Sequence, residues 1–122
     1  RTWTPMRRTN LPMAASKPYA GALSTGRRYL VCTTTADSGN RRAPLTIALS
    51  GNAEPVFSRI FRIRGAVHKG PGESGENCAL SYPYAVEHAG KLYVGYSNDG
   101  GRGHNHNSAE LAVLPLAGLS GG

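Results

Sequence analysis

A five-residue motif occurs twice in this 122-residue chain, and this repetition constrains the fold more than any other feature. Residues 16–20 read Ser-Lys-Pro-Tyr-Ala and residues 81–85 read Ser-Tyr-Pro-Tyr-Ala, an offset of 65. Each copy leads into an apolar run, a glycine and a second apolar run. A third segment also recurs, because residues 43–49 align with residues 109–115 at an offset of 66. Self-similarity at this period is typical of supersecondary units that bury their faces against their neighbours.

The composition indicates that these units are built from β-strands. Charged residues make up only 17% of the chain, and its 16 Gly and 8 Pro suit a fold with many turns. No ten-residue window shows a helical apolar period. The segments expected as strands are rich in Val, Ile, Tyr, Leu and Thr and are separated by glycines: 19–24, 28–34, 44–50, 56–63, 83–88, 91–97 and 109–115.

The first repeat contributes four such strands in about 45 residues, which is the size of one blade of a β-propeller. The second repeat contributes three. We therefore expect an all-β fold in which residues 19–63 form a four-stranded antiparallel blade. Residues 83–115 should form a three-stranded blade packed face to face against it.

The net charge of +7 comes almost wholly from arginine, with 11 Arg against 3 Lys. Because a guanidinium grips carboxylates and phosphates through paired donors, an anionic partner is expected. The arginine doublets at 7–8, 27–28 and 41–42 are scattered among strands and turns, and no nucleic-acid module is visible. We therefore expect an acidic carbohydrate and no nucleic acid. No apolar stretch approaches the ~20 residues of a membrane span, so no membrane partner is expected.

Cysteine and histidine add little chemistry. Cys32 lies in an apolar run, and we expect Cys32 and Cys78 to be free thiols. His104 and His106 flank Asn105, but no third ligand stands at suitable spacing, so no metal site is expected.

A set of short motifs resembles a known family. The chain contains Thr9-Asn10-Leu11-Pro12, then Arg42-Ala43-Pro44-Leu45, then Gly70-Pro71-Gly72-Glu73 and Ser81-Tyr82-Pro83. In this order they resemble the C-terminal part of a sialidase-like, BNR-repeat β-propeller. The resemblance implies about two blades of a six-bladed propeller, one over residues 9–66 and an incomplete final blade over residues 80–116. Because the chain opens on Arg1 rather than Met, we expect it to be a fragment that lacks N-terminal blades. A secreted or periplasmic location would suit such a protein.

The resemblance also implies a chemistry. Sialidases use a tyrosine nucleophile, because a carboxylate would be repelled by the substrate's own carboxylate. A glutamate takes the phenol proton, an aspartate protonates the leaving group, and three arginines hold the substrate carboxylate. The resemblance places Tyr82 at the nucleophile and Arg42 at the last of these arginines, with Arg41 as the fallback. Lys17 occupies the repeat position equivalent to Tyr82 and is a further substrate-binding candidate. No cofactor is implied.

Other parts of the pattern stay open. Glu73 and Glu76 precede Tyr82 in a loop, and Glu87 should lie on the opposite strand face from Tyr82, so the glutamate partner has no secure match. The family's Asp-box turn survives as residues 97–101, Ser-Asn-Asp-Gly-Gly, and is expected to be structural. Three functions therefore remain: a sialidase-type hydrolase for terminal acidic sugars, a non-catalytic glycan-binding propeller, and a propeller polysaccharide lyase acting on uronates.

Overall fold

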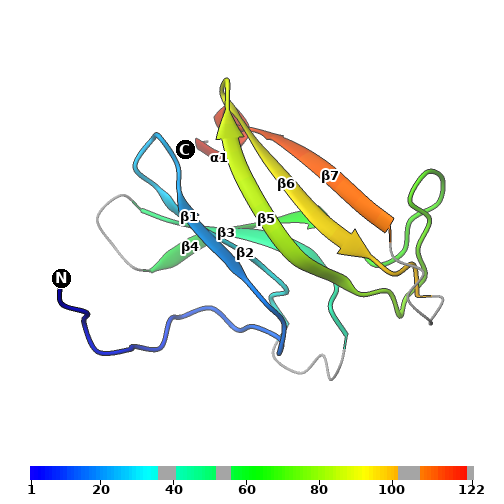
Figure 1. Cartoon of the computed structure of the whole chain (residues 1–122), viewed down its shortest axis with the longest axis horizontal. Coiled ribbons are helices and arrows are strands. Elements are labelled where there is room, and N and C mark those ends of the chain that lie inside the picture. Colours follow the sequence, from blue (N-terminus) through cyan, green and yellow to red (C-terminus); the bar gives the residue numbers. More distant parts are fainter. Residues whose placement is uncertain (36–40, 52–55, 102–107, 121–122) are drawn as a thin grey trace.

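The computed structural model describes residues 1–35, 41–51, 56–101 and 108–120, and within them the chain is all-β with one short helix (Figure 1). The elements are β1 (Tyr19–Ala22), β2 (Arg28–Cys32), β3 (Leu45–Ser50), β4 (Phe57–Arg64), β5 (Leu80–His88), β6 (Lys91–Asn98), β7 (Ser108–Pro115) and α1 (Leu116–Ser120).

The strands form two antiparallel sheets, as the repeat predicts. The N-terminal sheet has the order β1-β2-β3-β4 and the C-terminal sheet the order β5-β6-β7. β1 and β2 each end two residues before the expected position. β5 begins at Leu80, three residues early, because Leu80 and Ser81 pair with the end of β6. The sequence did not predict α1, which has five residues and is too short to show a helical period.

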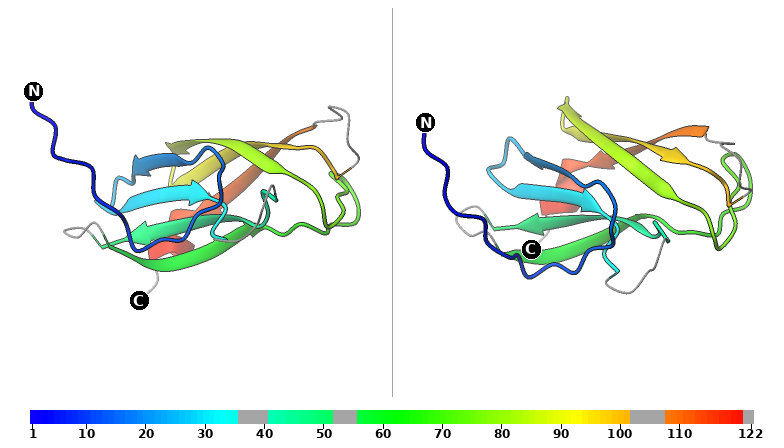
Figure 2. Two further views of the ribbon diagram at one scale, coloured as in Figure 1. Left: turned by 90° about the horizontal axis from the view of Figure 1, so that it is seen from below. Right: turned by 60° about the horizontal axis from the view of Figure 1, so that its bottom comes forward.

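One hydrophobic core lies between the two sheets (Figures 1 and 2). The face of the N-terminal sheet that lines this core is its front face, and it includes Tyr29, Val31 and Ile47. The face of the C-terminal sheet that lines the core is its back face, which includes Leu92 and Val94. We use different names for these two faces because they are not equivalent positions of the repeat, as the register below shows. The two sheets thus stack front to back, and strand alternation sends the other residues to the outer faces.

The strand pairing gives the structural alignment of the two repeats. Tyr19 pairs with Val31, which pairs with Ile47, and in the C-terminal sheet Tyr84 pairs with Gly95, which pairs with Leu111. β3 therefore matches β7 at an offset of 64. The sequence alignment at 66 was wrong by two residues, because the offset between the repeats falls from 65 at the first strands to 64 at the second and third strands. A shift of two residues keeps the same face, so the expected sidedness is unaffected.

The N-terminal segment covers the outer face of the N-terminal sheet (Figure 2). The amide of Ala14 donates to the carbonyl of Thr33 over 3.0 Å. The Asn10 side chain donates to the carbonyl of Phe57 and accepts from its amide, at 2.8 and 3.0 Å. Ala48 points away from the core, yet it is 0% exposed. The chain's own residues therefore cover this face around Ala48, whereas Ile60, its partner on β4, remains 50% exposed.

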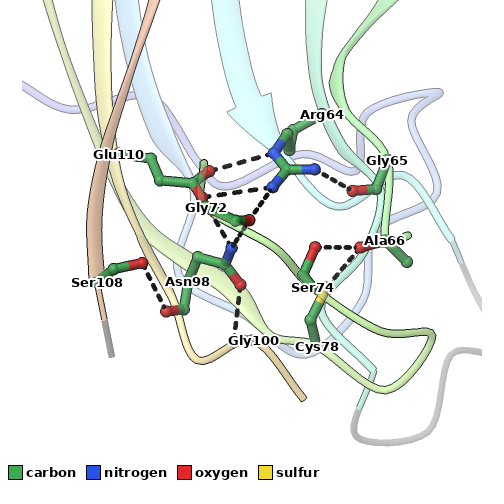
Figure 3. A network of polar contacts seen from close by, with 10 residues as sticks. All are labelled: Arg64, Gly65, Ala66, Gly72, Ser74, Cys78, Asn98, Gly100, Ser108 and Glu110. Carbon is green, nitrogen blue, oxygen red and sulfur yellow. Dashed lines mark hydrogen bonds and ion pairs between the residues drawn. The ribbon is translucent and has the colours of Figure 1, made fainter. Parts of the chain in front are cut away.

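A largely buried ion pair ties the outer strands of the two sheets together (Figure 3). The Arg64 Nε donates to Glu110 Oε2 at 3.2 Å, and a second guanidinium nitrogen donates to the carbonyl of Gly72 at 2.6 Å. Asn98 Nδ2 donates to Glu110 Oε1 at 2.8 Å. Burial and the adjacent Glu110 raise the pKa of Tyr96 to about 12. These polar groups satisfy one another, which is what a buried charge requires.

The Asp-box turn also has a structural role, as expected. Asp99 Oδ1 accepts hydrogen bonds from the amides of Ala79 at 2.7 Å and Gly101 at 2.9 Å. Asn98 Oδ1 accepts from the amide of Gly100 at 2.8 Å. The turn after β6 is thereby fixed to the residue that precedes β5. Both cysteines are free and buried, which confirms the expectation from their sequence context.

Candidate functional site

The structure brings Arg42 and Tyr82 together where β3 and β5 begin. Arg42 forms an isolated parallel bridge with Ala79, and its carbonyl accepts from the amide of Leu80 at 2.8 Å. This contact sets Arg42, three residues before β3, beside the start of β5. The guanidinium carbon of Arg42 lies 5.7 Å from the centroid of the Tyr82 ring, within the range of a cation–π interaction.

The backbone at Tyr82 has an unusual conformation. The pairing of β5 with β6 shifts register between Ser81 and Tyr84, so that two residues of β5 stand opposite the single residue Tyr96. At this bulge Tyr82 has φ of 53°, in the left-handed region that a bulky residue rarely adopts. Its side chain is 60% exposed, whereas the next residue, Pro83, is buried. The bulge therefore aims the phenol outward at a cost of about 1 kcal/mol.

The tyrosines shared by the two repeats contact each other beside this site. The rings of Tyr19 and Tyr84 are 4.8 Å apart between centroids, and Tyr19 also lies 6.3 Å from Tyr29. Burial and the neighbouring Tyr84 raise the pKa of Tyr19. These contacts join the first strands of the two sheets and place the beginning of β1 next to β5.

The two other predicted binding residues are not brought into contact with Tyr82. Lys17 and Arg41 are both exposed. In the described parts of the chain, the Arg64–Glu110 contact is the one ion pair, so neither side chain is held by a carboxylate there. Lys17 lies two residues before Tyr19, as Tyr82 lies two residues before Tyr84, but Lys17 precedes the start of β1.

None of the glutamate candidates forms a hydrogen bond with Tyr82 in the described parts of the chain. Glu87 points to the opposite face, as alternation predicts, and accepts from the amide of Ser24 at 2.8 Å and from the Ser24 hydroxyl. These hydrogen bonds lower the pKa of Glu87. Glu73 and Glu76 are exposed in the loop before β5. The site formed by residues 1–35, 41–51, 56–101 and 108–120 therefore consists of a cation and a phenol, without a carboxylate on Tyr82.

A second group of chemically capable residues was missed by the sequence analysis. Arg64, Tyr96 and Glu110 border a groove of about 390 Å³. The Arg64 guanidinium already donates to Glu110 and Gly72, and the raised pKa of Tyr96 disfavours a phenolate at neutral pH. We therefore assign this cluster to structure. The sequence feature that could have revealed this cluster is Glu110, a lone glutamate on the core side of the apolar strand β7.

A larger groove runs across the outer face of the C-terminal sheet, and Tyr82 stands at its border. Its volume is about 580 Å³, and its lining is mostly aromatic and aliphatic. Its lining includes Tyr82, Tyr84, Val86, Tyr93, Gly95 and Leu111.

The described residues contain no group of three or more His, Cys, Asp or Glu side chains that could hold a metal ion. The His104–His106 motif lies outside the described residues. As for membrane spans, none of the helices formed by the described residues has the length and apolar character to cross a bilayer.

Comparison with known proteins gives one family match. The model of the BNR repeat-like domain matches residues 1–94, which is more than three quarters of the chain. Neither the curated proteins nor the solved structures contain a significant match. The matched region includes the N-terminal sheet, β5 and the pair formed by Arg42 and Tyr82.

Proposed function

Because this chain belongs to the BNR repeat-like domain family, we propose that it forms part of a sialidase-like glycosidase that acts on terminal acidic sugars. In this proposal Arg42 binds the carboxylate of the sugar and Tyr82 is the nucleophile. Arg41 and Lys17 are further candidates for contacts with the substrate at the rim of the site.

The observation that carries the proposal is the pairing of Arg42 with Tyr82. The two residues are 40 positions apart in sequence, yet the Arg42 guanidinium carbon is 5.7 Å from the Tyr82 ring centroid. Tyr82 is exposed and has a left-handed backbone conformation, and such conformations cluster at functional sites. In the described residues no carboxylate pairs with Arg42, so its charge is available for an external anion.

The residue types fit the chemistry of a sialic acid. The substrate carboxylate sits on the anomeric carbon, and a bidentate Arg42 contact would hold that carbon near the Tyr82 hydroxyl. In the first step the Tyr82 oxygen bonds to the anomeric carbon while the glycosidic C–O bond breaks. The phenol proton passes to a carboxylate base, and a general acid protonates the leaving oxygen. Water then cleaves the tyrosyl intermediate and restores the phenol. We expect the base and the acid to come from blades other than the two described here.

A second function, a non-catalytic glycan-binding propeller, is supported by a different observation. The only glutamate on β5, Glu87, is engaged by Ser24 and faces away from Tyr82. An arginine and an exposed tyrosine without a base would bind an acidic sugar but would not cleave it.

Turnover of a fluorogenic sialoside by the full-length protein tests the proposal. Tyr82→Phe should abolish turnover and leave the binding of free sialic acid nearly unchanged, because it removes a nucleophile and no part of the carboxylate clamp. Tyr93→Phe, the same chemical change on β6, is the matched control and should keep full activity. Binding without turnover in the unaltered protein would favour the glycan-binding function. Normal turnover in the Tyr82→Phe variant would refute the nucleophile assignment.

A further inference from the structure

One edge of the strand β4 pairs with no other strand in the described parts of the chain. β4 is the last strand of the N-terminal sheet, and its strand partner there is β3 (Figure 2). The register shifts near both ends of this pairing, where Ser58 and Ile63 have no partner on β3, so the regular segment runs from Arg59 to Arg62. An open strand edge presents N–H and C=O groups that can pair with another extended chain.

A contact within the chain shows that this edge accepts a peptide-like group. Asn10 Nδ2 donates to the carbonyl of Phe57 at 2.8 Å, and the Phe57 amide donates to Asn10 Oδ1 at 3.0 Å. A residue of an adjacent antiparallel strand would form the same two hydrogen bonds. The side-chain amide of Asn10 therefore imitates one residue of an added strand at the beginning of β4.

The same contact identifies the open backbone groups farther along β4. Because both polar groups of Phe57 point away from β3, its pair with Ser50 is a non-hydrogen-bonded one. Bonded and non-bonded pairs alternate in an antiparallel ladder, so the backbone groups of Ile60 and Arg62 also point outward. In the described parts of the chain, no backbone group outside the sheet bonds to Ile60 or Arg62. These two residues therefore offer two donors and two acceptors in a row.

The charges on this segment favour an acidic occupant. Arg62 is exposed and Arg59 is half-buried. Among the described residues neither guanidinium has a carboxylate within ion-pair distance, since the one ion pair there is formed by Arg64. A carboxylate on an added strand, directly opposite either arginine, would form a cross-strand pair of opposite charges.

The side chains between the two arginines are apolar. Ile60 is 50% exposed and Phe61 is 37% exposed. Strand alternation places Ile60 and Arg62 on the outer face of the sheet, and Arg59 and Phe61 on the face toward the core. Each face of the segment thus presents one cation and one apolar side chain. The complementary strand has acidic residues at its first and fourth positions and apolar residues at the second and third.

A second copy of β4 does not fit this pattern. Antiparallel pairing of two copies about the middle of the segment would set Arg59 of one copy opposite Arg62 of the other, twice. Like charges that lie directly opposite each other destabilise a strand pair. The arginines therefore disfavour self-association through this edge and favour a partner of opposite charge.

We propose that the edge of β4 from Arg59 to Arg62 binds an extended acidic peptide segment of another protein, which adds a fifth strand to the N-terminal sheet. The backbone of Ile60 and Arg62 supplies the ladder, and the two arginines select the pattern acidic–apolar–apolar–acidic. This inference goes beyond the proposed glycosidase activity and does not depend on the chemistry at Arg42 and Tyr82.

Two synthetic peptides with the same composition and charge test the proposal. Thr-Glu-Val-Val-Glu-Thr has the complementary pattern, and its isomer Thr-Val-Glu-Glu-Val-Thr does not. Fluorescence anisotropy of the dye-labelled peptides with the full-length protein should show that the first binds at least about tenfold more tightly than the isomer. Methylation of both valine nitrogens should abolish binding, because it removes donors of the ladder. At saturation the first peptide should slow hydrogen exchange of the β4 amides at least about threefold.

Arg62→Glu should weaken binding of the first peptide at least about tenfold, whereas Lys91→Glu, the same change of charge at an exposed position of β6, should not. A peptide with Lys in place of the second Glu should bind the Arg62→Glu variant about as tightly as the first peptide binds the unaltered protein. Equal affinities of the two isomers, or binding that survives methylation, would overturn the proposal. Heparin that binds tightly in an Arg62-dependent manner, while neither isomer binds, would identify an anionic polysaccharide as the occupant and would also overturn it.

Discussion

The Arg42 guanidinium carbon lies 5.7 Å from the centroid of the Tyr82 ring, across the junction between the two sheets. The contact exists because Arg42, three residues before β3, bridges to Ala79, the residue that precedes β5. The proposed site depends on this relationship, and the rest of the fold supports it through contacts that can each be tested.

The strain at Tyr82 predicts an unusual response to substitution. Tyr82→Asn should leave the free energy of unfolding unchanged or raise it by up to about 1 kcal/mol, because asparagine tolerates the left-handed conformation at φ of 53°. Tyr93→Asn, on the neighbouring strand, should instead lower it by about 1 kcal/mol through lost strand packing. Urea unfolding curves compare the two variants. Equal losses of stability would show that the Tyr82 backbone carries no strain.

Removing one partner of the ion pair between the sheets should lower the free energy of unfolding strongly. Arg64→Ala leaves the Glu110 carboxylate and the Gly72 carbonyl without their donor in a largely buried place. We expect a loss of about 3 kcal/mol in the free energy of unfolding. The exposed Arg62 on the same strand is the control, and Arg62→Ala should change stability by less than about 0.5 kcal/mol. Similar results for the two variants would contradict the structural role of Arg64.

The same pair predicts a dependence of stability on pH. Burial would raise the pKa of Glu110, but the hydrogen bonds from Arg64 and Asn98 outweigh it and lower that pKa below its ordinary value. A lowered pKa in the folded state means that Glu110 contributes stability fully above about pH 5, and that this contribution is lost as the pH falls through its folded-state pKa. The unfolding free energy should therefore fall less between pH 5 and pH 3 in Glu110→Gln than in the unaltered chain. A Glu73→Gln variant should retain the full fall.

The Asp-box turn supplies a further prediction. Asp99→Ala removes the acceptor shared by the amides of Ala79 and Gly101 and should cost about 1–2 kcal/mol. Asp99→Asn keeps an acceptor oxygen in place and should cost less. Thermal unfolding followed by circular dichroism distinguishes them. If Asp99→Ala unfolded at the unaltered temperature, the turn would not be fixing β6 to the start of β5.

Local patterns in the sequence were sufficient to predict the sheets. The apolar runs and their bounding glycines located all seven strands, and the repeat predicted that 19–63 and 83–115 form separate sheets packed face to face. These features depend on neighbours along the chain. The boundary at Leu80 was missed, because that part of β5 is created by pairing with the end of β6 rather than by its own composition.

The geometry of the site depended on contacts that no local pattern contains. The motif placed Arg42 and Tyr82 in the chain, but the bulge that turns Tyr82 outward arises from a register shift against β6. The Arg64–Glu110 pair joins residues 46 positions apart, and a lone charge in a strand does not reveal its partner. Residues 104–106, at which no metal site was expected, lie outside the described residues.

The central claim is that Arg42 and Tyr82 form a binding site for an acidic sugar. Isothermal titration of the full-length protein with sialic acid tests it most directly, with the methyl ester of the same sugar as the uncharged control. We predict that Arg42→Ala weakens sialic acid binding by about 10- to 100-fold, because a charge-assisted contact is lost. The ester should bind the unaltered protein about as weakly as sialic acid binds the Arg42→Ala variant. Arg62→Ala should bind as the unaltered protein does. Equal affinity for the sugar and its ester, or an Arg42→Ala variant with undiminished affinity, would contradict the account.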